Sequence, residues 1–174
     1  MPEEQRSHAE PDALKTLRKW QRGLRVNHIS HHRSAARYAM LGRALGITVI
    51  VLSTVVGAAI FTTLKESLST AAKIGAGLLS LAAAVFSALQ TFLGFAQRQA
   101  AHHEAAVRYG ALRREIEAAL GLPPAEPELH RLLAHLRARW DEIDAAAPAV
   151  PQRIWRGAIK TVETAEAVAR KGSQ

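Results

Sequence analysis

Two long apolar segments dominate the pattern of hydrophobic and polar positions along this chain. The first, residues 45–64, reads LGITVIVLSTVVGAAIFTTL and holds 20 residues without a charge. The second, residues 74–96, reads IGAGLLSLAAAVFSALQTFLGFA and holds 23 residues without a charge. Apolar residues on every face of a helix this long are typical of lipid exposure and rare in a soluble bundle. Each helix would be roughly 30–35 Å long, which matches the hydrocarbon core of a bilayer. The pattern predicts two transmembrane helices.

The polar segment between these runs, residues 65–73, predicts the turn of a transmembrane hairpin. Lys65, Glu66 and Lys73 are the only charges between residues 44 and 97. Lys and Arg number four in residues 25–44 and four in residues 97–116, against two in the turn. The side richer in Lys and Arg faces the cytoplasm, so both termini are expected in the cytoplasm and the turn outside.

Amphipathic helices are predicted on both sides of the hairpin. Residues 1–44 form a basic helix that starts near Pro11–Asp12, residues 97–121 continue the second apolar helix, and residues 122–174 form further amphipathic helices. The last region carries an apolar face that we interpret as an assembly or partner surface, with Leu129, Leu132, Leu136, Trp140, Ile143 and Trp155. The predicted fold is an all-α membrane protein, in which a two-transmembrane hairpin extends into long cytoplasmic helices and the C-terminal amphipathic helices pack on this stalk.

The charge distribution favours a membrane surface over a nucleic acid. The chain has a formal net charge of +8, and residues 13–64 contain no Asp or Glu. Basic residues beside an apolar run are attracted to an anionic leaflet by about 1 kcal/mol each. We assign this role to Arg25, Arg33, Arg37, Arg43 and Arg98, and expect no DNA partner. A separate hypothesis has Arg22, Arg25 or Arg33 binding nucleotide phosphates.

Histidines and tyrosines gather in the predicted stalk. In an antiparallel pair, residues at equal height have numbers that sum to about 138, twice the turn centre, so Tyr38 is level with His102 and His28 with Tyr109. We therefore expect polar contacts among His28, His31, Tyr38, His102 and Tyr109. The i,i+4 spacing of His28 and His32 also suits a metal pair, and a pH sensor is a further interpretation. No carboxylate lies nearby in that segment, so packing is preferred and no metal or cofactor is predicted.

Catalytic chemistry has no candidate in this sequence. There is no cysteine, which excludes a disulfide framework, a thiolate zinc site and a cysteine nucleophile. No Ser-His-Asp arrangement, phosphate-binding loop or pair of catalytic carboxylates is recognisable. The sequence therefore predicts a protein that is not an enzyme.

Polar and small residues form a stripe on the second apolar segment. Ser80, Ser87 and Gly94 recur every seven residues, and Gln90 and Thr91 lie beside them. Ser53 and Gly57 make a pair of small residues on the first segment. The stripe predicts either tight helix packing or the lining of a pore. A pore needs several copies of the hairpin, and without charged rings it would be gated by a hydrophobic constriction.

The layout resembles a known family. Its most specific pieces are LQTFLGFAQRQAAHHEAAVRYGALRREIE and APAVPQRIW, and the likeness covers about residues 10–160. It resembles the SLATT domain, a bacterial two-transmembrane effector family. The resemblance implies a pore-forming effector of the bacterial inner membrane that kills the cell on phage infection. It also implies a trigger, either a nucleotide second messenger or a separately encoded sensor or nucleotidyltransferase.

Two functions of different classes follow. The first is a homo-oligomeric pore or channel effector in the lipid bilayer. The second is a membrane scaffold without a pore, which recruits a cytoplasmic partner through the apolar face between Leu129 and Ile143.

Overall fold

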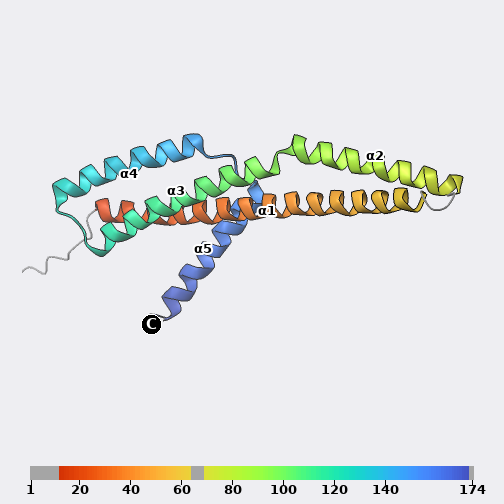
Figure 1. Ribbon diagram of the computed structural model, residues 1–174. Coiled ribbons are helices and arrows are strands. Elements are labelled where there is room, and N and C mark those ends of the chain that lie inside the picture. The colour runs from red at the N-terminus through yellow and green to blue at the C-terminus, as the bar shows by residue number, and fades with distance from the viewer. Residues whose placement is uncertain (1–11, 64–68, 173–174) are drawn as a thin grey trace, which may run out of the picture. The chain divides into compact units, whose positions relative to one another are not determined.

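The computed structural model describes residues 12–63 and 69–172, which form five helices and no strand (Figure 1). The helices are α1 (Asp12–Thr63), α2 (Thr70–Leu93), α3 (Phe95–Gly121), α4 (Glu126–Ala146) and α5 (Gln152–Gly172). The segments Asp12–Phe61 and Thr70–Gly121 are each long and apolar enough to cross a membrane, and the apolar window of each is wholly unburied. The predictions of an all-α fold and of two long apolar helices are confirmed.

The described residues fall into two compact units, which we treat separately. The packed unit comprises residues 12–34 and 101–172, and the apolar unit comprises residues 35–63 and 69–100. Helices α1 and α3 each contribute to both units.

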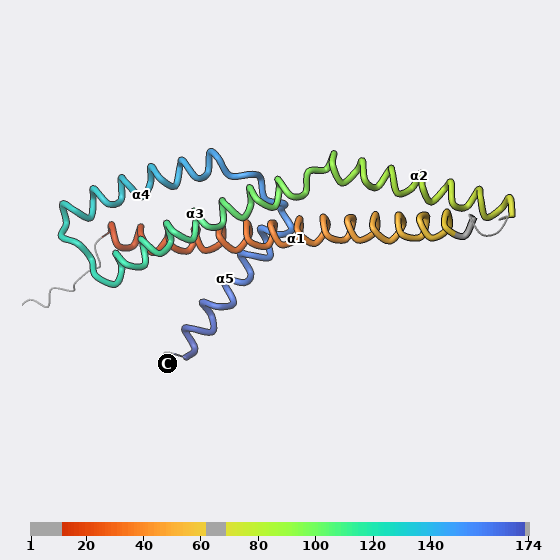
Figure 2. Tube along the Cα trace, viewed as in Figure 1, coloured from red at the N-terminus to blue at the C-terminus, as the bar shows by residue number. Residues whose placement is uncertain are grey.

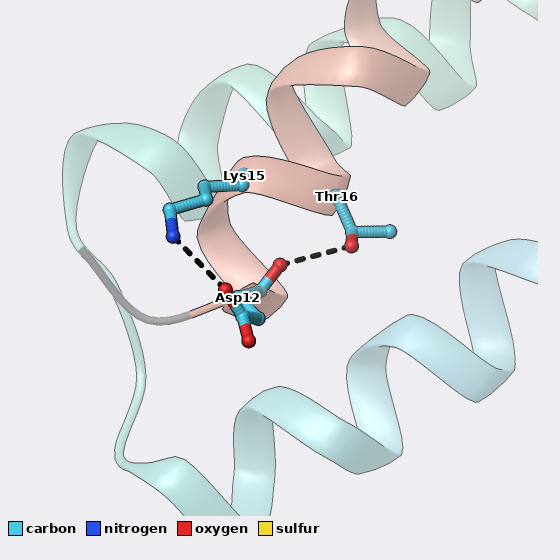
Figure 3. A network of polar contacts seen from close by, with 3 residues as sticks. All are labelled: Asp12, Lys15 and Thr16. Carbon is cyan, nitrogen blue, oxygen red and sulfur yellow. Dashed lines mark hydrogen bonds and ion pairs between the residues drawn. The ribbon is translucent and has the colours of Figure 1, made fainter. Parts of the chain in front are cut away.

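Helix α1 begins with a local polar network around Asp12 (Figure 3). The Lys15 ammonium donates to the Asp12 carboxylate at 2.9 Å, and the Thr16 hydroxyl donates to the Asp12 carbonyl oxygen at 2.9 Å. An acidic residue in the first turn complements the positive end of the helix dipole. The described part of α1 begins at Asp12, and Pro11, the other half of the predicted start signal, lies outside the described residues.

Helix α2 starts earlier than the apolar pattern predicted. Ser69 is its N-cap, and the Ser69 hydroxyl accepts a hydrogen bond from the Ala72 amide at 3.4 Å. The last four residues of the predicted turn, 70–73, are therefore helical, since a serine cap followed by good helix formers nucleates a helix regardless of charge. Lys65 and Glu66, the other charges of that turn, lie outside the described residues.

The expected continuous helix through residues 74–121 is interrupted at Gly94. This residue has φ 56° and ψ 41°, the left-handed conformation that ends α2 at Leu93. Glycine tolerates this conformation because it has no β-carbon. Helix α3 then begins at Phe95, with the Arg98 amide donating to the Gly94 carbonyl at 3.1 Å. The prediction of an unbroken helix was wrong at this position.

The packed unit has an apolar core built from α1, α3 and α4, which lie side by side in the Cα trace (Figure 2). Its buried residues come from all three helices: Leu17, Leu24, Ala105, Tyr109, Leu112, Ile116, Ala119, Leu129, Leu136 and Ile143. Leu132, Leu133 and Trp140 pack against this core from α4. The α4 face that we interpreted as an assembly surface is thus covered by the chain's own helices, because α1 and α3 present matching apolar faces. That interpretation is corrected.

Helix α5 packs on α1 through a second, smaller cluster. Val26 of α1 contacts Ala158 and Val162 of α5, with Ile29 and Ile159 at its edge. Polar contacts accompany it, since the Arg33 guanidinium donates to the Thr161 hydroxyl at 2.9 Å. Together the two clusters bury one face of every helix in the packed unit.

The apolar unit brings the second part of α1 against α2 in antiparallel order. A β-carbon added to Gly42 would lie 3.3 Å from Phe95, and one added to Gly46 would lie 3.6 Å from the Gln90 amide nitrogen. No residue of α2 is buried. Large apolar side chains are exposed on both helices: Ile47, Ile50, Val51, Val55, Ile60, Phe61, Ile74, Leu78, Leu81, Val85, Leu89 and Phe92. Exposed apolar surface of this extent marks a surface that contacts lipid or another protein.

Candidate functional site

Helix α2 presents three different faces. Gly75, Leu79, Ala82 and Phe86 are half-buried, as expected of the face toward α1. The large apolar residues Ile74, Leu78, Leu81, Val85, Leu89 and Phe92 form a second, exposed face. Ser80, Ala84, Ser87 and Thr91, spaced four, three and four residues apart, form a third face that is also exposed. We call this third face, together with Gln90 at its edge, the polar stripe.

Polar side chains in the apolar segments differ in how their hydrogen bonds are satisfied. The hydroxyls of Thr48, Thr54 and Thr91 each donate to the carbonyl four residues earlier, at 3.0, 2.8 and 3.3 Å. By contrast, the side chains of Ser80, Ser87 and Gln90 form no hydrogen bond within the described residues. On α1, Ser53 is exposed and Gly57 is half-buried. The polar stripe therefore carries unsatisfied donors and acceptors on an exposed face.

The polar stripe opens into a groove at the Gly94 end of the apolar unit. The groove has a volume of about 610 Å³ and is lined by Tyr38, Gly42, Arg43, Ser87, Gln90, Thr91 and Phe95, among others. The Tyr38 ring lies 6.3 Å from the Phe95 ring, and the Arg98 guanidinium lies 5.9 Å above the Tyr38 ring. Water and polar groups thus have access to one end of the stripe.

The basic residues that we assigned to a membrane surface occupy different settings. Arg37 and Arg43 are exposed in the apolar unit, and the Arg43 guanidinium Nε donates to the Ala39 carbonyl at 3.4 Å. Arg98 is also exposed and lies over Tyr38. In the packed unit, Arg33 bonds to Thr161, and Arg25 is half-buried beside a cavity.

A buried histidine pair lies in the packed unit. His31 is only 3% exposed, and its Nδ1 lies 3.1 Å from Nδ1 of the buried His102. The Tyr109 ring lies 5.2 Å from the His31 ring. The Tyr109 hydroxyl donates to the Asp144 carboxylate at 2.6 Å, and the Trp140 indole donates to the same oxygen at 3.1 Å. Histidines from α1 and α3 are thus tied to a carboxylate of α4.

Burial sets the protonation of this cluster. Burial, and secondly the nearby His102, lower the pKa of His31 from 6.5 to about 4, with Asp144 acting in the opposite direction. Burial also lowers the pKa of His102. Burial, followed by the hydrogen bond and the charge of Asp144, raises the pKa of Tyr109. One histidine must donate and the other accept across the 3.1 Å contact, so at least one of the two imidazoles is neutral.

His28 occupies a notch at Gly110. The His28 Nδ1 lies 2.8 Å from the Ala106 carbonyl oxygen, and a β-carbon added to Gly110 would lie 2.9 Å from the same Nδ1. The His28 and His32 rings are nearly parallel, with centroids 6.4 Å apart. Within residues 12–63 and 69–172, no group of three or more His, Asp or Glu side chains is arranged to hold a metal ion.

The structure brings together part of the predicted histidine and tyrosine set. It places His31, His102 and Tyr109 in one cluster, and His28 one turn away, beside Ala106 and Gly110. His102 lies beside His31, and Tyr38 contacts Phe95 and Arg98. Asp144 was missed, because its partner Tyr109 is 35 residues away and nothing in the local pattern links them. The contact of the Arg139 Nη1 with both carboxylate oxygens of Glu115 was missed for the same reason.

The histidine pair predicts a loss of stability in acid. Because the pKa of His31 is lowered on folding, the unfolded chain binds more protons, and stability falls as the pH decreases from about 6.5 toward about 4. A difference of one bound proton between the folded and unfolded chains changes the free energy of unfolding by at most about 1.4 kcal/mol per pH unit. Thermal unfolding of the detergent-solubilised protein across this range should show the decline, and His31→Gln should flatten it. The exposed His135 provides the control, since His135→Gln should leave the slope unchanged; equal slopes in all three proteins would contradict the assignment.

Comparisons of this chain with models of protein families, with curated proteins and with solved structures find no match. The function is therefore argued from the geometry of the polar stripe and of the packed unit.

Proposed function

We propose that this protein is a homo-oligomeric membrane effector whose apolar helices span the bilayer and form a pore. The observation that carries this proposal is the polar stripe, where Ser80, Ser87 and Gln90 are exposed without a hydrogen bond within the described residues. In lipid, an unsatisfied polar group costs several kcal/mol. Such side chains therefore turn toward another helix or toward water.

The geometry of α2 favours several copies around a shared path. Its apolar face suits lipid and its half-buried face suits α1. The Gly94 end of the polar stripe shares a groove with α1, and the exposed Ser80 is left for contacts outside the hairpin. A single pair of helices cannot enclose a channel, so the stripe would line one only after assembly. No charged residue lies on the stripe between Ser80 and Thr91, which favours a pore of low ion selectivity with a hydrophobic gate.

The resemblance to the SLATT family supports the biological setting of this proposal. In that setting the protein lies in the bacterial inner membrane and permeabilises it during phage infection. A nucleotide second messenger, or a separately encoded sensor or nucleotidyltransferase, acts as the trigger. The packed unit then stands in the cytoplasm, where such a signal is available.

The alternative function, a membrane scaffold without a pore, is less well supported because most of its proposed partner surface is buried. It relied on the apolar face of α4, whose residues Leu129, Leu136 and Ile143 are buried in the core of the packed unit. Of the residues assigned to that face, Trp155 on α5 is the most exposed, at 36%. One partly exposed tryptophan is a small anchor for a partner, so the pore is the better supported function.

Reconstitution tests the proposal directly. The purified protein is incorporated into liposomes loaded with a self-quenching dye, and release is followed with and without cyclic nucleotides as candidate triggers. We expect protein-dependent dye release and conductance steps in planar bilayers. Liposomes that stay sealed under all these conditions, with the protein shown to be inserted, would refute a pore.

The proposed orientation is testable because the natural chain has no cysteine. A membrane-impermeant maleimide added to intact spheroplasts should label Ser69→Cys, since Ser69 is exposed at the start of α2. It should label Arg131→Cys, on the exposed side of α4, only after lysis. The reverse pattern would place the packed unit outside the cell and overturn the assignment from Lys and Arg counts.

A further inference from the structure

A cationic cavity lies in the packed unit among α1, α3 and α5. Its volume is about 550 Å³, within the usual range for small-molecule sites. Five arginines line it, three from α1 and one each from α3 and α5: Arg18, Arg22, Arg25, Arg113 and Arg170. Neither the pore nor the core of the packed unit accounts for the convergence of five guanidinium groups from three helices.

Carboxylates of the described residues lie close to two of these arginines. Glu117 and Glu166 also line the cavity, and Glu163 lies 3.5 Å from Arg22. Arg22 is itself shared between Glu163 and Glu166, the latter at 3.2 Å. Glu117 accepts from the Gln21 amide at 3.3 Å and lies 3.4 Å from the Arg113 Nε. Among the described residues, these carboxylates thus pair with Arg22 and Arg113, Arg18 and Arg170 have further interactions of their own, and Arg25 forms no ion pair.

Two of the arginines hold unused donors. The Nε of Arg113 is buried but forms no hydrogen bond, because its 3.4 Å approach to Glu117 lacks the required geometry. Arg25 is half-buried and forms no ion pair or hydrogen bond within the described residues. A guanidinium group taken partly out of water without a partner is costly, so an anion in the cavity would stabilise Arg25. It would also add a hydrogen-bond acceptor beside Arg113, which is already paired with Glu117.

We propose that this cavity binds the phosphoryl groups of a small phosphorylated molecule, with Arg25 and Arg113 as its principal ligands. The planar guanidinium matches two phosphate oxygens at once, which explains arginine rather than lysine at all five positions. A phosphoryl group suits a lining of arginines, and the volume admits a molecule of nucleotide size. Such a ligand could be soluble or could be the headgroup of an anionic lipid, since both present the same phosphoryl chemistry. In the first case, the site would give the proposed pore a place to receive its trigger.

The binding experiment does not depend on pore activity. A failure of the proposed phosphoryl site can therefore be distinguished from a failure of the proposed pore. Inorganic pyrophosphate is titrated by calorimetry into the full chain in non-ionic detergent micelles. We expect Arg25→Gln and Arg113→Gln each to weaken binding by about 10- to 100-fold, the loss of a charged hydrogen-bond partner. Arg131→Gln removes the same charge from an exposed position of α4 and should leave binding unchanged. Arg25→Lys keeps the charge but loses the planar fork, and should recover only part of the affinity.

A second arm identifies the source of the phosphoryl group. The same proteins in nanodiscs are compared for enrichment of phosphatidylglycerol over phosphatidylcholine. Pyrophosphate binding that is lost only in the Arg25 and Arg113 variants supports a soluble ligand. Phosphatidylglycerol enrichment that is lost in the same two variants, without pyrophosphate binding, supports a lipid headgroup. Absence of both, or equal loss in Arg131→Gln, overturns the site. If Arg113→Gln does not fold, Arg25→Gln decides alone, because Arg25 holds no ion pair that folding requires within the described residues.

Discussion

Replacing Ser87 and Gln90 together by leucine is expected to reduce dye release by an order of magnitude or more while leaving membrane insertion intact. Both side chains belong to the polar stripe, and both line the groove of the apolar unit. Leucine at these positions removes the hydroxyl and the amide that would contact water in a pore. A narrow path lined by apolar side chains dewets and closes to ions.

The matched control lies on the same helix. Val85→Leu and Phe92→Leu change exposed apolar residues of α2, on the face that we assign to lipid. They alter side-chain volume at similar depth but remove no polar group, so release should stay close to that of the natural protein. If dye release falls equally in both double variants, the loss reflects a general disturbance of helix packing and not the removal of polar groups. If the variant with leucine at Ser87 and Gln90 releases as much dye as the natural protein, the polar stripe does not line the pore.

Leu112→Ala is expected to destabilise the packed unit by about 2–5 kcal/mol, the usual cost of a buried leucine truncated to alanine. Leu112 is 0% exposed and belongs to the core cluster that joins α1, α3 and α4. Truncation of its side chain leaves a cavity in this core, which can close only if neighbouring groups move. Thermal unfolding in detergent, followed by circular dichroism, measures the loss.

A control for this substitution is close by. Leu122, just after α3, is 84% exposed, so Leu122→Ala should change stability by less than about 0.5 kcal/mol. If the two variants unfold alike, α3 does not form the centre of the packed unit. A large loss for Leu112→Ala that also abolishes pyrophosphate binding would show that the cationic cavity depends on an intact core.

Much of the fold could be predicted because its signals are local. Charge-free runs of 20 and 23 residues fix the two apolar helices, and the spacing of Leu129, Leu136 and Ile143 fixes one face of α4. The break at Gly94 was missed, because a glycine in an apolar run can also sit inside a helix, where it costs only about 1 kcal/mol. The α4 face was assigned to a partner for a related reason. Periodicity shows that a face will be covered, but it does not show by what.

The candidate sites were harder to predict because their contacts are distant in sequence. Counting residues from the turn placed His28 near Tyr109, and the structure has His28 against Ala106 and Gly110, on either side of that position. The same count put Tyr38 level with His102, and it did not anticipate the contact of His102 with His31. A count from the turn gives the height of a residue along the helix, but it does not give the direction in which its side chain points. Arg22 and Arg25 were singled out as phosphate ligands, but Arg113 and Arg170 join them only through tertiary packing.

The notch at Gly110 restricts how α3 can move along α1. Sliding α3 by one helical turn would bring Ala106 or Arg114 opposite the His28 ring in place of Gly110, and the space that His28 occupies exists only because Gly110 lacks a side chain. Axial translation of these two helices past each other is therefore sterically blocked. A crosslink between α1 and α3 that prevents only sliding should therefore leave the fold of the packed unit unchanged.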